Sequence, residues 1–329
     1  MINLEPKYSQ YNECIENQVY TIVNGMGYTN EFAYIDSMFF GFDITTYTDA
    51  KWSKIGELID ITYDLYIENL SKFWNIEVQL MLCDYEDFTI ELKKSLASGL
   101  PLIVFINSYW CPWERGLYKR HKGFNHAFIV RDFTNDGYCC TDGHRGIKDC
   151  FISKEDLFNG YLGKIIKIRW NRNISKQLSW KKMISHAVGN ISQQNQLFCG
   201  NIRFLKNAII NRLDMKMELK GFESSFITVK QAPLIAAIRR IKNERKKFKW
   251  CVESIQTEYK LSHIEELKQI INLADNSAEH WKILSVLFIK YFYSSDIKHK
   301  EKIVDLIDEI IEIEQNINKI MIKVINTNV

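Results

Sequence analysis

One hairpin signal constrains the fold of this chain more than any other feature. His126 opens the apolar run NHAFIV, which has the composition of a buried strand. An Asn-Asp-Gly turn at 135–137 follows it, and the next strand-like run, YCCTD, ends in Asp142. In an antiparallel hairpin, the start of the first strand lies beside the end of the second. The sequence therefore predicts that His126 and Asp142 lie side by side on rigid backbone.

Cys14 lies near the start of a predicted helix. Apolar residues recur at helical spacing after it, and Gly25 and Gly27 end the pattern. Asn12 is the predicted N-cap, which places Cys14 in the first helical turn. Amide hydrogens and the positive end of the helix dipole stabilise a thiolate there, and the same amides can hold an oxyanion.

Together these three residues have the order and placement of a catalytic triad. Cys14 would be the nucleophile, His126 its base, and Asp142 the acid that orients the imidazole. Each alone has a plainer interpretation, because a helical cysteine is usually a small core residue and such a histidine is usually a satisfied polar group. The combination favours the catalytic interpretation. Cys111 is the alternative nucleophile, but it precedes a proline in a loop, without a helix terminus beside it.

The pattern of the chain changes once along its length. With 329 residues, 46% of them hydrophobic, it is long enough for one large domain or, as we expect, two. Up to residue 171 helices are followed by strands joined through hairpins, which indicates an α+β fold with an antiparallel sheet. From there on, helix follows helix. We therefore expect a catalytic domain over 1–171 and an all-α domain over 172–329, with the boundary in the segment 171–178.

Local patterns predict further elements of the first part. An amphipathic helix is predicted over 52–74, and another helix ends at Gly99, before the strand LIVFI. Ser153 and Asp156 form the cap of a short helix, and KIIKIRW follows it as a strand.

The last predicted helix carries a heptad pattern. Ile303, Ile310, Ile317 and Val324 recur every seven residues, with apolar residues between them. So short a seam is marginal alone, which favours packing inside the chain's own helical bundle. A coiled coil between two copies, and hence a homodimer, is the alternative.

The composition is typical of a cytoplasmic protein. No apolar stretch reaches membrane-spanning length, and the start MINLEPKYSQ lacks the apolar core of a signal peptide. The eight cysteines show no CxxC pair, as expected of reduced thiols without a metal site. A net charge of +3 is too small to indicate nucleic-acid binding. We expect no bound metal and no nucleic-acid or membrane partner.

Four stretches carry a resemblance to a known family: CIENQVYTIVNGMG, SLASGLPLIVFINSYWCPW, YKRHKGFNHAFIV and GYCCTDGHRGIKDCFISKEDLF. They resemble the butirosin biosynthesis protein H family, papain-fold enzymes that transfer an acyl group from a carrier-protein thioester to an amine. The chain is also similar in kind to a papain-like enzyme that forms amide bonds in closthioamide assembly. The resemblance implies a papain-like domain over 1–171, with Cys14 as nucleophile, His126 as base and Asp142 as orienting acid.

Two positions depart from the family's pattern. The family often continues from the histidine strand into a Gly-Tyr-Asp turn, where this chain has Arg131-Asp132-Phe133. The papain-type glutamine before the nucleophile has no direct counterpart. Gln10, four residues before Cys14, is the nearest candidate for the side-chain donor of the oxyanion hole.

The resemblance implies acyl transfer in secondary-metabolite biosynthesis, of the peptide, thioamide or aminoglycoside type. Cys14 would take the acyl group from the phosphopantetheine arm of an acyl or peptidyl carrier protein and pass it to a small-molecule amine. This chain itself would bind no cofactor, because the carrier protein brings the phosphopantetheine. Tyr109, Trp110 and Trp113 are candidate walls of the substrate pocket, or an ordinary packed loop.

A carrier protein presents an acidic helix, so a basic run on a predicted helix is a candidate docking site. A solvated helix face is the plainer interpretation of such a run. The candidate residues are Arg239, Arg240, Arg245, Lys246 and Lys247, with Lys242 and Lys249 beside them.

Two other functions stay open. A papain-like cysteine peptidase or amidohydrolase would use the same three residues on an amide bond. A non-catalytic carrier-binding protein would retain the triad without using it. The large helical part and the lack of a secretion signal or exporter segment favour acyl transfer.

Overall fold

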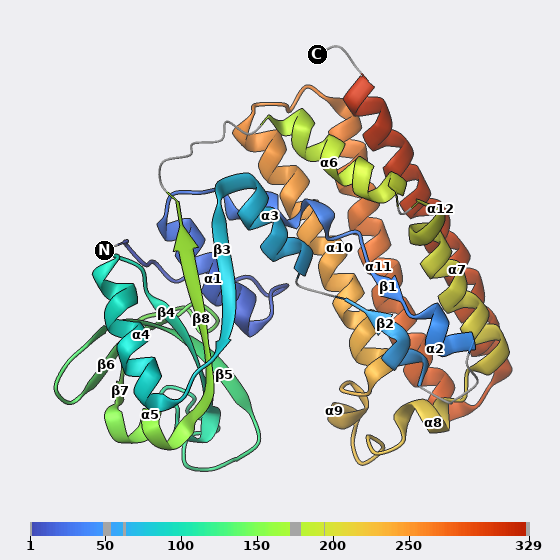
Figure 1. The fold of residues 1–329 in the computed structure, drawn as a ribbon. Coiled ribbons are helices and arrows are strands. Elements are labelled where there is room, and N and C mark those ends of the chain that lie inside the picture. The colour runs from blue at the N-terminus through green and yellow to red at the C-terminus, as the bar shows by residue number, and fades with distance from the viewer. Residues whose placement is uncertain (1, 49–53, 62–63, 172–178, 194, 327–329) are drawn as a thin grey trace. The chain divides into compact units, whose positions relative to one another are not determined.

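The computed structural model describes residues 2–48, 54–61, 64–171, 179–193 and 195–326 (Figure 1). The chain forms two compact units, and each is discontinuous in sequence. The first comprises Met1–Asn30 and Ile67–Lys176, and the second comprises Glu31–Tyr66 and Gln177–Val329. The predicted boundary cut the chain once, whereas these units interleave. Residues 172–178 of the predicted boundary segment lie outside the described residues.

The first unit is built on one antiparallel sheet, as the hairpin signal predicts. Its six strands follow the order β3-β8-β4-β5-β6-β7, and every neighbouring pair is antiparallel. The strands β5 and β6 are the predicted hairpin. The bounds are β3 (Ile76–Leu82), β4 (Leu102–Asn107), β5 (Asn125–Phe133), β6 (Gly137–Asp142), β7 (Ile147–Ser153) and β8 (Tyr161–Trp170).

Helices pack against this sheet. The helix α1 (Cys14–Gly25) packs on β5, and α4 (Tyr85–Ala97) packs on β4, β5 and β8. Phe88 and Leu92 of α4 share a core with Val104 and Phe128 of the central strands. Their strand neighbours are buried as well, so both faces of β4 and β5 are covered. The short helix α5 (Lys154–Gly160) joins β7 to β8.

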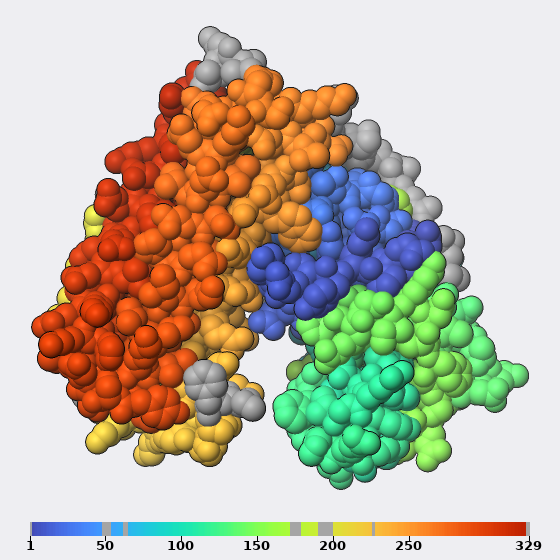
Figure 2. Space-filling model, turned by 180° about the vertical axis from the view of Figure 1, so that it is seen from behind, coloured from blue at the N-terminus to red at the C-terminus, as the bar shows by residue number. Residues whose placement is uncertain are grey.

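The second unit is mainly helical. Successive long helices pack on one another, α10 on α11 and α11 on α12, and their side chains form a continuous surface, orange to red in Figure 2. A short ladder of β1 (Gly41–Phe42) and β2 (Ile59–Asp60) and small helices accompany them: η1 (Asn30–Asp36), α2 (Ile44–Thr48) and η2 (Ile55–Leu58). The remaining helices are α6 (Trp180–Gln193), α7 (Asn195–Arg212), α8 (Met215–Leu219), α9 (Phe226–Val229), α10 (Pro233–Glu258), α11 (Glu265–Ser294) and α12 (Ile297–Asn326).

The heptad seam of α12 faces the interior of this unit. Ile303, Ile310, Ile317 and Val324 are all buried, and α12 packs against α6, α7 and α11 of the same chain. The prediction of packing within the chain's own bundle is confirmed. Among helices of the described ranges, none has the length and hydropathy that crossing a membrane requires.

Most predicted elements of the first unit are present. Gly99 follows α4 with a φ of 80°, a conformation that favours glycine, and Ser153 caps α5 by accepting a hydrogen bond of 3.0 Å from the Asp156 amide. The single helix predicted over 52–74 is wrong. The described part of that segment comprises η2, the strand β2 and a helix α3 (Asp64–Trp74), because β2 pairs with β1; residues 52–53 and 62–63 lie outside the described ranges.

Candidate active site

Cys14 is the first residue of α1, so its backbone N–H is one of those that have no partner within a helix. The cap differs from the prediction. Glu13, and not Asn12, is the N-cap residue, and the Glu16 carboxylate accepts a hydrogen bond of 2.7 Å from the Glu13 amide. The Glu16 side chain, one turn into the helix, therefore accepts from a backbone N–H at the start of α1. The placement of Cys14 in the first turn is confirmed.

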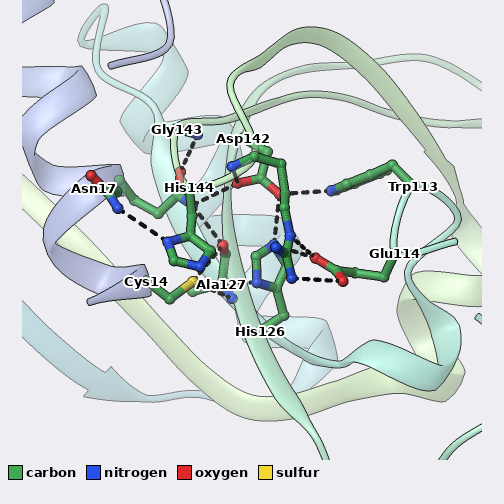
Figure 3. A network of polar contacts seen from close by, with 11 residues as sticks. Cys14, Asn17, Trp113, Glu114, His126, Ala127, Asp142, Gly143 and His144 are labelled. Carbon is green, nitrogen blue, oxygen red and sulfur yellow. Dashed lines mark hydrogen bonds and ion pairs between the residues drawn. The ribbon is translucent and has the colours of Figure 1, made fainter. Parts of the chain in front are cut away.

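His126 lies between the sulfur of Cys14 and the carboxylate of Asp142 (Figure 3). Its Nδ1 is 3.3 Å from the Cys14 Sγ, and its Nε2 is 2.6 Å from the Asp142 Oδ2. His126 pairs with Ile106 in the β4–β5 ladder, so the ring is held on the sheet. The structure thus brings the three predicted residues together, with the two ring nitrogens on different partners.

The backbone of Ala127 forms a second contact with the nucleophile. Its N–H lies 3.4 Å from the Cys14 Sγ and its carbonyl oxygen lies 3.3 Å from the same atom. The N–H donates to a thiolate, whereas the carbonyl accepts from a thiol. This part of β5 therefore satisfies the sulfur in either protonation state.

The carboxylate of Asp142 is fully buried and is surrounded by donors. Besides His126, the indole of Trp113 donates to it at 2.7 Å, the Gln18 amide at 3.0 Å, and the backbone N–H of Arg145 at 3.0 Å. Burial raises the pKa of Asp142, but the hydrogen bonds and the charge of His126 outweigh it and hold that pKa below its usual range. Asp142 is consequently ionised and fixed in one orientation.

The same contacts set the protonation of His126. Burial lowers the pKa of His126, but hydrogen bonds to Asp142 and Cys14, and their charges, raise it to about 10. At neutral pH the ring is thus an imidazolium beside the sulfur. A cation in that position stabilises the thiolate, the nucleophilic form of cysteine.

A second buried carboxylate lies on the far side of the ring. The Glu114 carboxylate lies 3.8 Å from the His126 Nε2. It is paired with the Arg145 guanidinium, whose Nη2 donates to the Glu114 Oε2 at 2.9 Å. Ligand atoms of Glu114, His126 and Asp142 lie within 4.8 Å of one another and could hold a metal ion. A metal there would have to displace the donors that Arg145 and Trp113 now supply.

Gln18 is a residue of this site that the sequence patterns did not indicate. It lies one turn after Cys14 on α1, and its amide nitrogen donates to the Ala127 carbonyl at 2.8 Å as well as to Asp142. Its amide oxygen accepts from the Gly143 N–H at 2.9 Å. Gln18 therefore ties the nucleophile helix to both strands of the hairpin. Its spacing of four residues from Cys14 is the one signal that could have identified it.

The predicted pocket residues have different surroundings. Trp113 holds Asp142 and packs its ring edge against Phe128, so it is part of the acid's environment. Tyr109 and Trp110 are half-buried in η3 (Ser108–Trp110), and the Lys119 ammonium lies 3.4 Å from the centre of the Trp110 ring.

Two other candidates differ in exposure. Gln10 is exposed in the turn before α1, and its role as an oxyanion donor stays a prediction. Cys111 is fully buried, and burial and the charges of Asp142 and Glu114 raise the pKa of its thiol. The alternative nucleophile is therefore held as an inert thiol.

The predicted docking run on α10 needs a correction. Arg245 is fully buried and donates hydrogen bonds of 2.8 and 2.9 Å to Glu314 of α12. Lys247 is also buried, with its ammonium 2.7 Å from Glu244. A long charged side chain can face a bundle interior when a carboxylate neutralises it there. These two residues stabilise the helical unit and do not present charge to a partner.

The other residues of the run are more accessible. Lys246 is largely covered and binds Asp275 and Glu279 of α11, at 2.7 and 3.0 Å. Arg239 and Arg240 are exposed on α10. Only this pair of the five predicted docking residues projects into solvent.

A cysteine at a helix start, facing a histidine and an acid on an antiparallel sheet, is the papain-like arrangement. Its chemistry is attack of a thiolate on a carbonyl carbon, followed by release of the acyl group to a second nucleophile. The buried acid and the protonated ring make this site suited to that chemistry.

Comparison with known proteins adds structural neighbours only. No family model matches the chain, and no curated protein matches it. Among solved structures, the peptidase domain of ComA from Streptococcus mutans is similar, with 19% identity and a TM-score of 0.23 over 33% of this chain and 75% of that one. The peptidase domain of Streptococcus ComA, a bifunctional ABC transporter of a quorum-sensing pathway, gives 15% identity and a TM-score of 0.23 over 44% and 94%. At such values the functional assignment depends on the site itself.

Proposed function

We propose that this protein is a cysteine-dependent acyltransferase that forms amide bonds. It would move an acyl group from the phosphopantetheine thioester of a carrier protein, through Cys14, to an amine. The observation that supports this most is the unbroken contact from Cys14 through His126 to Asp142, at 3.3 and 2.6 Å.

The reaction has two steps. The Cys14 thiolate attacks the thioester carbonyl carbon, the carbon–sulfur bond to the carrier breaks, and His126 gives its proton to the departing thiol. The amine then attacks the acyl-cysteine carbonyl, His126 takes a proton from the amine nitrogen, and the amide leaves as Cys14 becomes a thiolate again. A thioester loses its leaving group more readily than an amide does, so a carrier-bound donor drives the transfer forward.

Hydrolysis is the competing outcome, because water can take the place of the amine. A peptidase with this triad would accept an amide donor and use water in the second step. A transferase has to exclude water and position the amine, which raises the effective concentration of the amine. Whether the acyl group passes to an amine or to water therefore distinguishes a transferase from a peptidase.

The test supplies an acylated carrier protein and a primary amine to the purified protein. We expect an amide product whose yield rises with amine concentration while release of the free acid falls. Intact-protein mass spectrometry should show an acyl adduct in the native protein and in Cys111→Ala, and none in Cys14→Ala. Efficient cleavage of peptides, with carrier thioesters left intact across several acyl groups, would establish the peptidase instead.

A further inference from the structure

Attack on a carbonyl places negative charge on its oxygen, and enzymes of this kind hold that oxygen with donors fixed in advance. The Cys14 backbone N–H is one such donor. Gln10 is exposed in the preceding turn. Asn12 is close in sequence, and its side-chain amide atoms are buried without a partner in the described structure. A second donor can also come from another element.

His144 is placed to be that donor. It follows Asp142 by two residues, in the turn that joins β6 to β7, and it is only half-buried. The centre of its ring lies 6.1 Å from that of His126. The ring therefore lies against α1 one turn after Cys14, where its Nδ1 meets the Asn17 amide (Figure 3).

The amide of Asn17 fixes which nitrogen of His144 carries hydrogen. The Asn17 Oδ1 accepts a hydrogen bond of 2.9 Å from the Ser9 N–H, so the other atom of that amide is Nδ2. Nδ2 lies 3.2 Å from the Ser9 carbonyl oxygen, 3.4 Å from the Asn12 carbonyl oxygen and 3.1 Å from the His144 Nδ1. A hydrogen on Nδ1 would set two N–H groups against each other there, so Nδ1 is the ring nitrogen without hydrogen. The neutral ring therefore carries its hydrogen on Nε2.

The surroundings of His144 favour this neutral form. Burial and the charges of Arg145 and His126 lower the pKa of His144. The two histidines thus differ in protonation state. His126 is protonated and exchanges its proton, while His144 is neutral and only donates a hydrogen bond.

We propose that His144 is a catalytic residue whose Nε2–H, with the Cys14 N–H, binds the oxygen of the tetrahedral intermediate. This role rests on the acyl-enzyme chemistry of the proposed function. As the Cys14 sulfur bonds to the carbonyl carbon, the carbon–oxygen π pair moves onto the oxygen, and both donors stabilise that charge. The pair returns when the leaving group departs, and no proton leaves His144.

The test separates acylation from alkylation of the same sulfur. Acylation by phenyl thioacetate forms a tetrahedral oxyanion, whereas alkylation by iodoacetamide is a direct displacement at a saturated carbon and needs no oxyanion donor. The variants are His144→Phe, which retains a ring but removes the donor, and His144→Gln, which restores an N–H. His263→Phe, at an exposed position of the helical unit, is the matched control.

We expect His144→Phe to slow acylation of Cys14 by about 10²- to 10³-fold, the usual effect of removing one such donor, while alkylation changes by less than about two-fold. His144→Gln should recover about ten-fold or more of the lost rate, and His263→Phe should match the native protein. Equal loss in both reactions would overturn the proposal, since it would mean that His144 only supports Cys14 and His126.

Undiminished acylation in His144→Phe would also overturn the proposed role of His144. A native protein that is alkylated at Cys14 but never acylated by phenyl thioacetate would overturn it too. Neither reagent involves a carrier protein or an amine acceptor, so failure of the amide-forming activity leaves this test decisive.

Discussion

The Nε2 of His126 lies 2.6 Å from the Asp142 Oδ2, and both side chains are buried. This contact leaves Nδ1 of the ring for the Cys14 sulfur, 3.3 Å away. The acid thus acts on the nucleophile only through the orientation and charge of the histidine. That order of contacts determines which variants of the three residues should slow acylation most.

We predict that His126→Ala slows acylation of Cys14 by about 10²- to 10⁴-fold, because the base and the cation are both removed. Asp142→Asn should be milder, since the ring remains beside the sulfur and the amide oxygen of the asparagine can still accept from Trp113 or from Gln18. Single-turnover acylation rates with a small thioester give both values. If Asp142→Asn proved more damaging than His126→Ala, the assignment of base and orienting acid would be wrong.

The charge of His126 should appear in the pH dependence of stability. A histidine in an unfolded chain titrates near about 6.5, whereas the contacts with Asp142 and Cys14 overcome burial and raise the pKa of His126 to about 10. The folded protein thus binds this proton more tightly. The resulting stabilisation is full below about pH 6.5 and is lost as the pH rises through about 10.

Urea unfolding of the native protein and of His126→Gln, from about pH 6 to about pH 10.5, measures this contribution. We expect the difference between their free energies of unfolding to shrink steadily as the pH rises. A difference that stays constant or grows would show that His126 is neutral in the folded protein.

The hairpin and the cysteine could be placed from sequence because their signals are local. Periodicity marks the helix that begins at Cys14, and the turn formers join the strands of His126 and Asp142. Glu114 could not be found in this way, because its role depends on partners that only the folded chain brings near, and Gln18 offered only its spacing from Cys14. The burial of Arg245 was hidden for the same reason, since a run of charges does not reveal which one meets Glu314.

The close packing behind the site gives a prediction about Gly143. A Cβ at this position would lie 2.3 Å from the Thr21 hydroxyl and 2.5 Å from the Asn17 carbonyl oxygen, both on α1. We expect Gly143→Ala to destabilise the fold by about 1–3 kcal/mol and to slow acylation, because the turn after Asp142 must move away from α1. Thermal melts and acylation rates would measure both effects.

Gly116→Ala is the matched control for that variant. A Cβ there has nothing within 4 Å, and Gly116 is not among the glycines with positive φ. Its melting temperature and acylation rate should match those of the native protein. An unchanged Gly143→Ala protein would mean that the turn and α1 are not packed as closely as described.

The docking prediction now rests on the exposed pair Arg239 and Arg240. Reversing both charges, as Arg239→Glu with Arg240→Glu, should raise the KM for an acylated carrier protein by about ten-fold at low salt, because steering and surface attraction are lost. The effect should shrink as the salt concentration rises, since salt screens exposed charges. A small thioester that lacks the carrier should be used at the native rate.

Lys247→Glu is the structural comparison: it removes a buried cation beside Glu244 and should lower the melting temperature instead. Should the double variant use both donors equally poorly, Arg239 and Arg240 would be supporting the fold, and the carrier would bind elsewhere on the protein.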